Sequence, residues 1–228
     1  MKIGILDDYL QVALEYAPFK DLEPEHQLSI FSAGIAGEKL IETLQAFDVL
    51  LVMRERTAFP ADIIEQLPNL KLIITTGRRN DVIDMEACKS AGITVCGTDS
   101  PGYGTAELTF ALILAAAKGV ITEHNHMRVG GWQSGLAGNL KGRTLGVMGL
   151  GRLGGMVAGY AQVMDMNVIA WSTNLTRERT GECGVKFVSK EELMSQSDFM
   201  TIHLRLSDHT HHLVKAKDLS MMKDGSWI

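Results

Sequence analysis

Residues 145–155, LGVMGLGRLGG, contain three glycines in the spacing Gly149-x-Gly151-x-x-Gly154. An apolar run precedes them and a helix-compatible segment follows, which predicts a strand, a tight turn and a helix. In this arrangement the first glycine permits the turn, the second lets the backbone approach a pyrophosphate, and the third lets the helix pack closely. The pattern is therefore typical of a dinucleotide-binding loop. The alternative is a helix start that needs glycine only for packing.

Composition sets the broad class of the protein. The chain has 228 residues, of which 46% are apolar and 21% are charged, and its formal net charge is −5. This is typical of a globular protein with one large or two small domains. The negative charge gives no electrostatic reason to expect nucleic acid or an anionic membrane as a partner. Cys88, Cys96 and Cys183 match neither a disulfide framework nor a zinc site, so we expect a cytoplasmic protein without a metal site.

The first hundred residues alternate between short apolar runs and amphipathic stretches. The runs that favour strands are residues 2–6, 27–31, 48–53, 70–75 and 93–96. Amphipathic stretches such as 38–44 and 61–67 predict helices between them. The alternation predicts βαβ units and a parallel sheet, in which ligands bind beyond the carboxyl ends of the strands. The loops after Met53 and Thr76 are therefore candidate binding loops.

The cluster Ser100-Pro101-Gly102-Tyr103-Gly104 predicts a boundary between a domain over residues 1–100 and a second over residues 101–228. A long helix is expected over 105–122, capped by Thr105 and buried along its apolar middle. A loop with several glycines follows over 128–142. Beyond the glycine motif, the pattern predicts strands at 167–171 and 199–204, helices at 190–195 and 215–222, and the start of another strand at 225–228.

Segments spread over nearly the whole chain resemble the D-isomer-specific 2-hydroxyacid dehydrogenase family. They are Thr105-Ala106-Glu107, Gly130-Gly131-Trp132, residues 140–154, Ser197-Asp198-Phe199, residues 201–204, Leu206-Ser207 and residues 221–225. The resemblance implies an α/β fold of two doubly wound parallel-sheet domains, a flavodoxin-like substrate domain and a Rossmann nucleotide domain. It implies an oxidoreductase that transfers a hydride between NAD(P)H and a small 2-oxo or 2-hydroxy acid. It also implies a homodimer that pairs through residues 105–140.

The family's catalytic Arg, Glu and His are all expected beyond Ile228, so no catalytic residue is assigned in this chain. The stop on entering a strand favours a fragment that lacks the C-terminal part of its nucleotide domain, and such a fragment could be inactive. The alternative function is a non-catalytic dinucleotide-binding or sensing protein of the same fold, such as an NAD-binding corepressor.

The resemblance also implies a set of cofactor-binding residues. They are Thr105, Gly149, Gly151, Arg152, Leu153, Gly154, Ser172, Asn174, His203, Leu204 and Thr210. Arg152 and Leu153 match positions whose backbone N–H groups meet the pyrophosphate. His203 is nearly as readily a structural histidine, and Thr210 a cap of its own turn. Arg205 stands where the family usually has proline, so the local loop geometry is expected to differ.

Ser172 lies at the end of the second predicted strand of this domain, where an acidic residue would bind the ribose 2′-hydroxyl. Asn174, Arg177 and Arg179 follow it. A serine with nearby arginines would accept a 2′-phosphate, so NADP is favoured over NAD. The alternative is that the arginines pair with neighbouring glutamates on the surface.

The substrate-binding residues are expected in the first domain. Gly77 and Arg78 match the family loop whose backbone N–H groups hold the substrate carboxylate. Arg54 follows the third strand and could contact an anionic substrate, or pair with Glu55 or Asp62 instead. No metal site is assigned to the histidines of residues 209–212, because they lie in a predicted loop without a constellation of cysteines or carboxylates.

Overall fold

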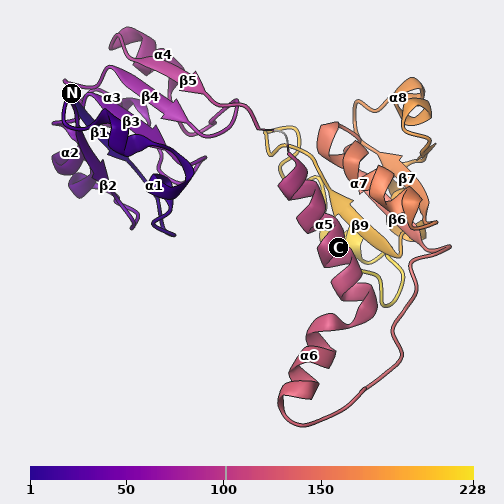
Figure 1. Ribbon diagram of the computed structural model, residues 1–228. Coiled ribbons are helices and arrows are strands. Elements are labelled where there is room, and N and C mark those ends of the chain that lie inside the picture. Colours follow the sequence, from indigo (N-terminus) through magenta and orange to yellow (C-terminus); the bar gives the residue numbers. More distant parts are fainter. Residues whose placement is uncertain (101) are drawn as a thin grey trace. The chain divides into compact units, whose positions relative to one another are not determined.

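The structure is a computed structural model that describes residues 1–100 and 102–228 (Figure 1). Pro101, part of the predicted boundary cluster, lies outside the described residues. The chain divides into two compact units, Met1–Pro101 and Gly102–Ile228. Each unit is built on its own parallel sheet.

The first unit has a five-stranded sheet in the order β2-β1-β3-β4-β5. The strands are β1 (Lys2–Ile5), β2 (Gln27–Ile30), β3 (Val49–Val52), β4 (Leu72–Thr75) and β5 (Thr94–Gly97). The helices are α1 (Ala13–Tyr16), α2 (Glu38–Leu44), α3 (Ala61–Ile64) and α4 (Met85–Ser90), with a 3-10 helix, η1, at Phe19–Leu22. This strand order is that of flavodoxin-like folds, which confirms the predicted class.

Continuous apolar runs form the central strands because both faces of a parallel sheet are covered. Leu50 on β3 and Ile73 on β4 are fully buried, and they pack with Leu44 and Ile64 from the helices. A helix start is stabilised where a side chain accepts from its free N–H groups. Asp84 does this for α4 by accepting a hydrogen bond from the N–H of Ala87 (2.9 Å).

The second unit has a four-stranded sheet in the order β8-β7-β6-β9. The strands are β6 (Thr144–Met148), β7 (Asn167–Trp171), β8 (Lys186–Phe187) and β9 (Phe199–Ile202). The helices are α5 (Tyr103–Lys118), α6 (Val120–Arg128), α7 (Arg152–Val163), α8 (Arg177–Glu182), α9 (Lys190–Gln196) and α10 (Ala216–Leu219). The order matches four strands of the Rossmann sheet, which confirms the predicted class.

Contacts of Asp198 and Phe199 fix the amino-terminal end of β9. The Asp198 carboxylate accepts from the N–H of Thr144 (2.7 Å) and pairs with Lys223 (3.0 Å). Burial by itself would raise the pKa of Asp198, but these hydrogen bonds and nearby cations outweigh burial and lower it. Phe199 forms a parallel bridge with Trp227, in the segment predicted to begin another strand.

The long helix differs from its prediction in three ways. It begins at Tyr103, so Thr105 lies inside the first turn and does not cap it. It ends at Lys118, because Gly119 adopts a left-handed conformation (φ 62°) that stops α5 and starts α6. Its middle is buried on one face only, since Leu108 and Leu112 are 61% and 60% exposed. The predicted burial of the whole middle is therefore wrong.

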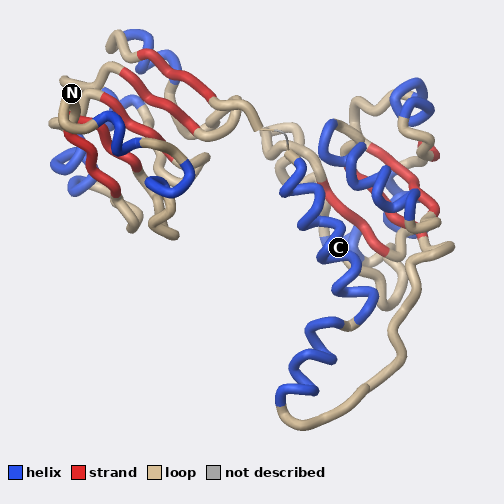
Figure 2. Tube along the Cα trace, viewed as in Figure 1, coloured by secondary structure: helices blue, strands red, loops and turns tan. Residues whose placement is uncertain are grey.

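Among the described residues, no single helix is long and apolar enough to span a membrane. The pair α5 and α6 reaches that length and hydropathy together, but it is bent by 62°. Figure 2 shows the long loop that returns from the end of α6 to β6, at the place where a loop was predicted. Helix α8 and strand β8 were not predicted.

Candidate nucleotide-binding site

The candidate site lies at the carboxyl ends of β6 and β9. From β6 the sheet continues through β7 on one side and β9 on the other. The loops that follow β6 and β9 therefore diverge, and such a point is where doubly wound sheets bind ligands. Leu204 and Thr210, both predicted cofactor residues, line a pocket of about 300 Å³ here together with Met148.

The three glycines of the motif meet three different environments. Gly149 has a φ of 98°, and a Cβ there would lie 2.8 Å from Leu204 Cδ2 and 3.0 Å from the carbonyl of His203. A Cβ on Gly154 would collide with the carbonyl oxygen of Gly149. At Gly151, in contrast, no heavy atom lies within 4 Å of a Cβ position, so this face of the loop is open.

Gly151 is the N-cap residue of α7, a helix of twelve residues. The first N–H groups of a helix have no partner within the helix, and glycine has no side chain to cap them. The helix start also carries the positive end of the helix dipole. Open space next to such N–H groups fits the pyrophosphate of a dinucleotide. Arg152 and Leu153 form the first turn of α7, as the predicted phosphate contact requires.

Helix α8 connects to this loop through Arg179. The guanidinium donates from Nε to the carbonyl of Leu150 (3.1 Å) and from Nη2 to the carbonyl of Gly151 (3.4 Å). Its Nη1 also pairs with Glu182 (3.0 Å), so the alternative surface ion pair is present as well. The other arginine, Arg177, stacks over the ring of Phe187 at 5.3 Å. The contact of Arg179 with the loop carbonyls has no local signal in the sequence, because it depends on where α8 packs.

Ser172 and Asn174 lie on the turn between β7 and α8. Ser172 is half-buried, and its carbonyl accepts from the N–H of Leu175 (3.2 Å). Asn174 is exposed. Thr176 then caps α8 by accepting from the N–H of Arg179 (3.2 Å). The turn thus follows β7 directly, where the ribose-reading residue was expected.

His203 and Leu204 directly follow β9. The N–H of His203 donates to the carbonyl of Met148 (2.8 Å), which continues the sheet for one residue. Its Nε2 lies 3.0 Å from the hydroxyl of Thr201, and burial lowers its pKa, which favours the neutral ring at neutral pH. Both interpretations of His203, structural and cofactor-facing, fit this position.

The hydroxyl of Thr210 is used within its own turn. It donates to the carbonyl of Arg205 (2.6 Å) and accepts from the N–H of Ser207 (2.8 Å). This is the capping role named as the alternative. Thr105 is exposed in the first turn of α5. The residue before that helix, Gly102, is close to the motif, because a Cβ there would lie 2.8 Å from Leu153 Cδ2.

In the first unit, the predicted substrate residues lie on the adjacent loops after β3 and β4. Gly77 has a φ of 98°, and a Cβ there would collide with the guanidinium of Arg54. The structure therefore brings Arg54 and Gly77 together. The N–H of Gly77 already donates to the hydroxyl of Thr98 (2.9 Å). Arg54 pairs with Glu55 (3.5 Å), which is one of the two ion pairs named above as the alternative to substrate binding.

Arg78 extends from the same loop and pairs with Asp99 (2.7 Å). Buried Asn80 joins the two loops, since its amide donates to the carbonyl of Arg54 (2.6 Å) and the hydroxyl of Thr75 (3.0 Å). The loop after β1 was not singled out from the sequence. It holds the buried Asp7, whose carboxylate accepts from Thr57 Oγ1 (2.8 Å). An acid directly after the first strand is the signal that could have drawn attention to it.

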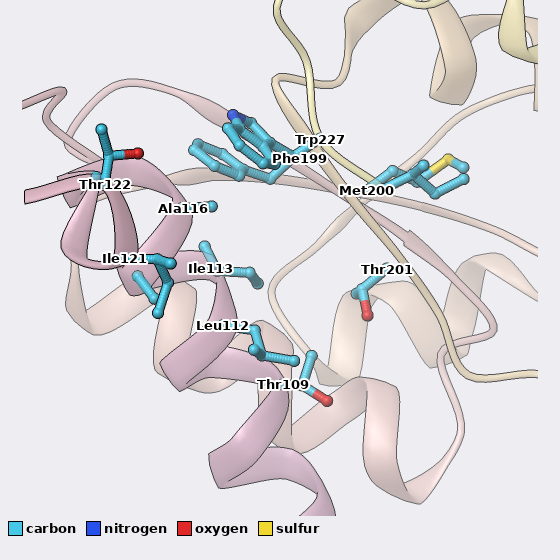
Figure 3. Close-up of a pocket in the computed structure, with 13 residues that line it drawn as sticks. Thr109, Leu112, Ile113, Ala116, Ile121, Thr122, Phe199, Met200, Thr201 and Trp227 are labelled. Carbon is cyan, nitrogen blue, oxygen red and sulfur yellow. The ribbon is translucent and has the colours of Figure 1, made fainter. Parts of the chain in front are cut away.

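A larger pocket of about 590 Å³ lies elsewhere in the second unit, between α5, α6 and β9 (Figure 3). Trp227 and Phe199 lie close together on one side, and Leu112 and Ile113 of α5 on the other. Its described lining includes none of the predicted cofactor residues. Over the described part of the chain, no group of three His, Cys, Asp or Glu side chains is placed to hold a metal ion.

Comparison with known proteins agrees with this geometry. Residues 110–228 match the family model described as D-isomer specific 2-hydroxyacid dehydrogenase, NAD binding domain. The chain is 32% identical to D-3-phosphoglycerate dehydrogenase of Archaeoglobus fulgidus over 99% of its own length and 42% of that relative. It is 37% identical to glyoxylate reductase of Aeropyrum pernix over 71% of its own length and 51% of that relative. It thus spans about half the length of such curated relatives or less.

Among solved structures, phosphoglycerate oxidoreductase from Vibrio cholerae O395 superposes with a TM-score of 0.92 at 36% identity. The match covers 100% of this chain and 74% of that one. The family model covers more than half of the chain, including the glycine motif, and both strand orders agree with the fold. The chain therefore belongs to the D-isomer-specific 2-hydroxyacid dehydrogenase family.

Proposed function

We propose that this chain binds NAD(P) at the start of α7 and belongs to an oxidoreductase that acts on a small 2-oxo or 2-hydroxy acid. The observation that carries the proposal is the contrast within the motif. A Cβ on Gly154 would collide with the carbonyl of Gly149, whereas Gly151 faces open space beside the start of α7, which Gly151 itself cannot cap with a side chain. When bound, the nicotinamide supplies or accepts the hydride.

Two arginines of the first unit support an anionic substrate. Arg54 lies against Gly77, and Arg78 extends from the same pair of loops. The ion pair between Arg78 and Asp99 is more than 70% exposed on both sides, so it contributes little and an incoming carboxylate can replace it. Relatives named glyoxylate reductase and hydroxypyruvate reductase reduce, by their names, small 2-oxo acids.

We propose NADP as the preferred cofactor. Ser172 presents no negative charge where an acid would repel a 2′-phosphate. Arg177 is exposed, lies five residues after Ser172, and would add a positive charge near the same site. The absence of a carboxylate at Ser172 is the main support for this preference.

The test measures binding and turnover separately. We expect this chain to bind reduced cofactor, and the complete protein to consume it with glyoxylate, hydroxypyruvate or pyruvate, followed by the absorbance of the reduced nicotinamide. Binding without turnover by the complete protein would favour a non-catalytic NAD-binding protein, such as a corepressor. Gly151→Ala should weaken binding about tenfold, because its Cβ enters the space assigned to the pyrophosphate.

Gly159→Ala is the matched control, since it adds the same methyl group at another open position of α7. It should leave the dissociation constant unchanged. Equal affinity of both variants and the original chain would contradict binding at the start of α7.

We further propose a cytoplasmic homodimer that pairs through residues 105–140. Its support is the row of exposed apolar side chains on this segment. They are Leu108, Leu112, Val120, Ile121, Met127, Val129, Trp132 and Leu136. Exposed apolar patches of this kind are typical of protein interfaces.

A further inference from the structure

In the second unit, hydrogen bonds from Arg179 connect α8 to the glycine loop, and the glycine motif does not predict them. Arg179 reaches back from α8 and donates to two consecutive carbonyls of the loop, those of Leu150 (3.1 Å) and Gly151 (3.4 Å). Its side chain is 41% exposed, so the guanidinium is partly withdrawn from water. Glu182 holds the remaining arm of the guanidinium at 3.0 Å.

The geometry of the peptide bond determines where the N–H groups of this loop point. In a trans peptide the carbonyl and the following N–H point to opposite sides of the chain. The carbonyls of Leu150 and Gly151 face Arg179, so the N–H groups of Gly151 and Arg152 point away from it. These N–H groups are on the side that the proposed function assigns to the pyrophosphate.

The surroundings are suited to an arginine. A guanidinium donates in several directions from one rigid plane, whereas a lysine ammonium is a single point charge. Room for the guanidinium comes from Gly155, where a Cβ would lie only 3.2 Å from Arg179 Nη2. Gly155 is outside the Gly149-x-Gly151-x-x-Gly154 spacing, so the dinucleotide motif does not account for it.

We infer that Arg179 is a positioning residue for the dinucleotide loop, which orients the peptides of Leu150 and Gly151 so that their N–H sides face the cofactor phosphates. The inference rests on the proposed function. It differs from the expectation that Arg179 binds a 2′-phosphate directly, because a positioning residue acts equally on NAD and NADP.

The experiment compares Arg179→Gln and Arg179→Lys with the original chain. The ligands are ADP-ribose and 2′-phospho-ADP-ribose, which share the pyrophosphate and differ only in the 2′-phosphate. We expect Arg179→Gln to weaken both ligands by the same factor, about five- to twentyfold. Arg179→Lys keeps the charge but not the two-carbonyl contact, and should lose affinity for both ligands to a similar extent.

Arg143→Gln is the control for the loss of a positive charge. Arg143 is exposed directly before β6, at the end of that strand opposite the glycine loop, and stacks over Phe199. This variant should bind both ligands as the original chain does. A loss confined to 2′-phospho-ADP-ribose in Arg179→Gln, or no loss in either ligand, would overturn the inference.

Hydrogen–deuterium exchange of the free protein separates this inference from the proposed function. We expect faster exchange of the amides of residues 149–155 in Arg179→Gln and unchanged exchange in Arg143→Gln. Unchanged loop exchange in Arg179→Gln would refute the positioning role even if cofactor binds. Failure of the original chain to bind either ligand would refute the proposed function and, with it, the role in cofactor binding.

Discussion

Two glycines of the same helix should respond in opposite ways to the same added methyl group. Gly154 and Gly159 both lie in α7. A Cβ on Gly154 would collide with the carbonyl oxygen of Gly149 and lie 3.0 Å from Val147 Cγ1. A Cβ on Gly159 meets no heavy atom within 4 Å. Comparing the two variants therefore separates the effect of alanine on helix propensity from its effect on the close packing of α7 against β6 and the loop that follows it.

The magnitudes follow from these distances. Alanine is favoured over glycine inside a helix by about 1 kcal/mol. Forcing a methyl group into a close-packed site costs about 1–3 kcal/mol, and the backbone at Gly149 yields less than a side chain would. Gly154→Ala should thus lower the free energy of unfolding by up to about 2 kcal/mol. Gly159→Ala should raise it by up to about 1 kcal/mol.

Thermal unfolding followed by circular dichroism measures both changes. For a unit of this size, each kcal/mol shifts Tm by about 3–5 °C. We expect a lower Tm for Gly154→Ala and a higher Tm for Gly159→Ala. If the two variants shift Tm in the same direction, the close approach of α7 to the loop is not what requires glycine at position 154.

Four further outcomes are expected. Ser189→Ala removes the cap of α9 and should cost about 1 kcal/mol in chemical denaturation, and an unchanged midpoint would contradict the cap. The lowered pKa of Asp198 means that its ionised form stabilises the fold above the unfolded value of about 3.9, and that this contribution is lost as pH falls through the folded pKa. The Tm gap between the original chain and Asp198→Asn should therefore be larger at pH 7 than at about pH 3, and a constant gap would argue against the linkage. Leu112→Asp should convert the dimer to a monomer in light scattering, and a monomeric original chain would contradict the proposed dimer. Ser172→Asp should shift the ratio of dissociation constants toward NADH by about tenfold or more, and an unchanged ratio would remove the support for NADP.

Local patterns in the sequence predicted most of the elements. The amphipathic stretch 38–44 coincides with α2, because the spacing of its apolar residues is a property of the helix itself. The continuous apolar runs of the first unit became its five parallel strands for the same local reason. Glycine spacing, flanked by strand and helix patterns, located the start of α7. Each of these patterns involves residues that are close together in the chain, so the sequence alone is enough to recognise the element.

Contacts between distant segments required the tertiary structure. Thr105 has the chemistry of a cap, yet α5 starts two residues earlier, after Gly102, which adopts a left-handed conformation (φ 78°) and lies close to Leu153. Leu108 and Leu112 are apolar like their buried neighbours, and only the packing of α5 in the core with α7 decides which face of α5 is covered.

The contact of Arg179 with the glycine loop is the clearest case. Arg179 and Gly151 are 28 positions apart, and they meet because β7 pairs beside β6 and directs α8 back over the loop. The sequence by itself determined that a glycine-rich turn joins a strand to a helix. Only the tertiary structure decided which side chain orients that turn, because the pairing of strands, rather than any local pattern, sets the distance between the two segments.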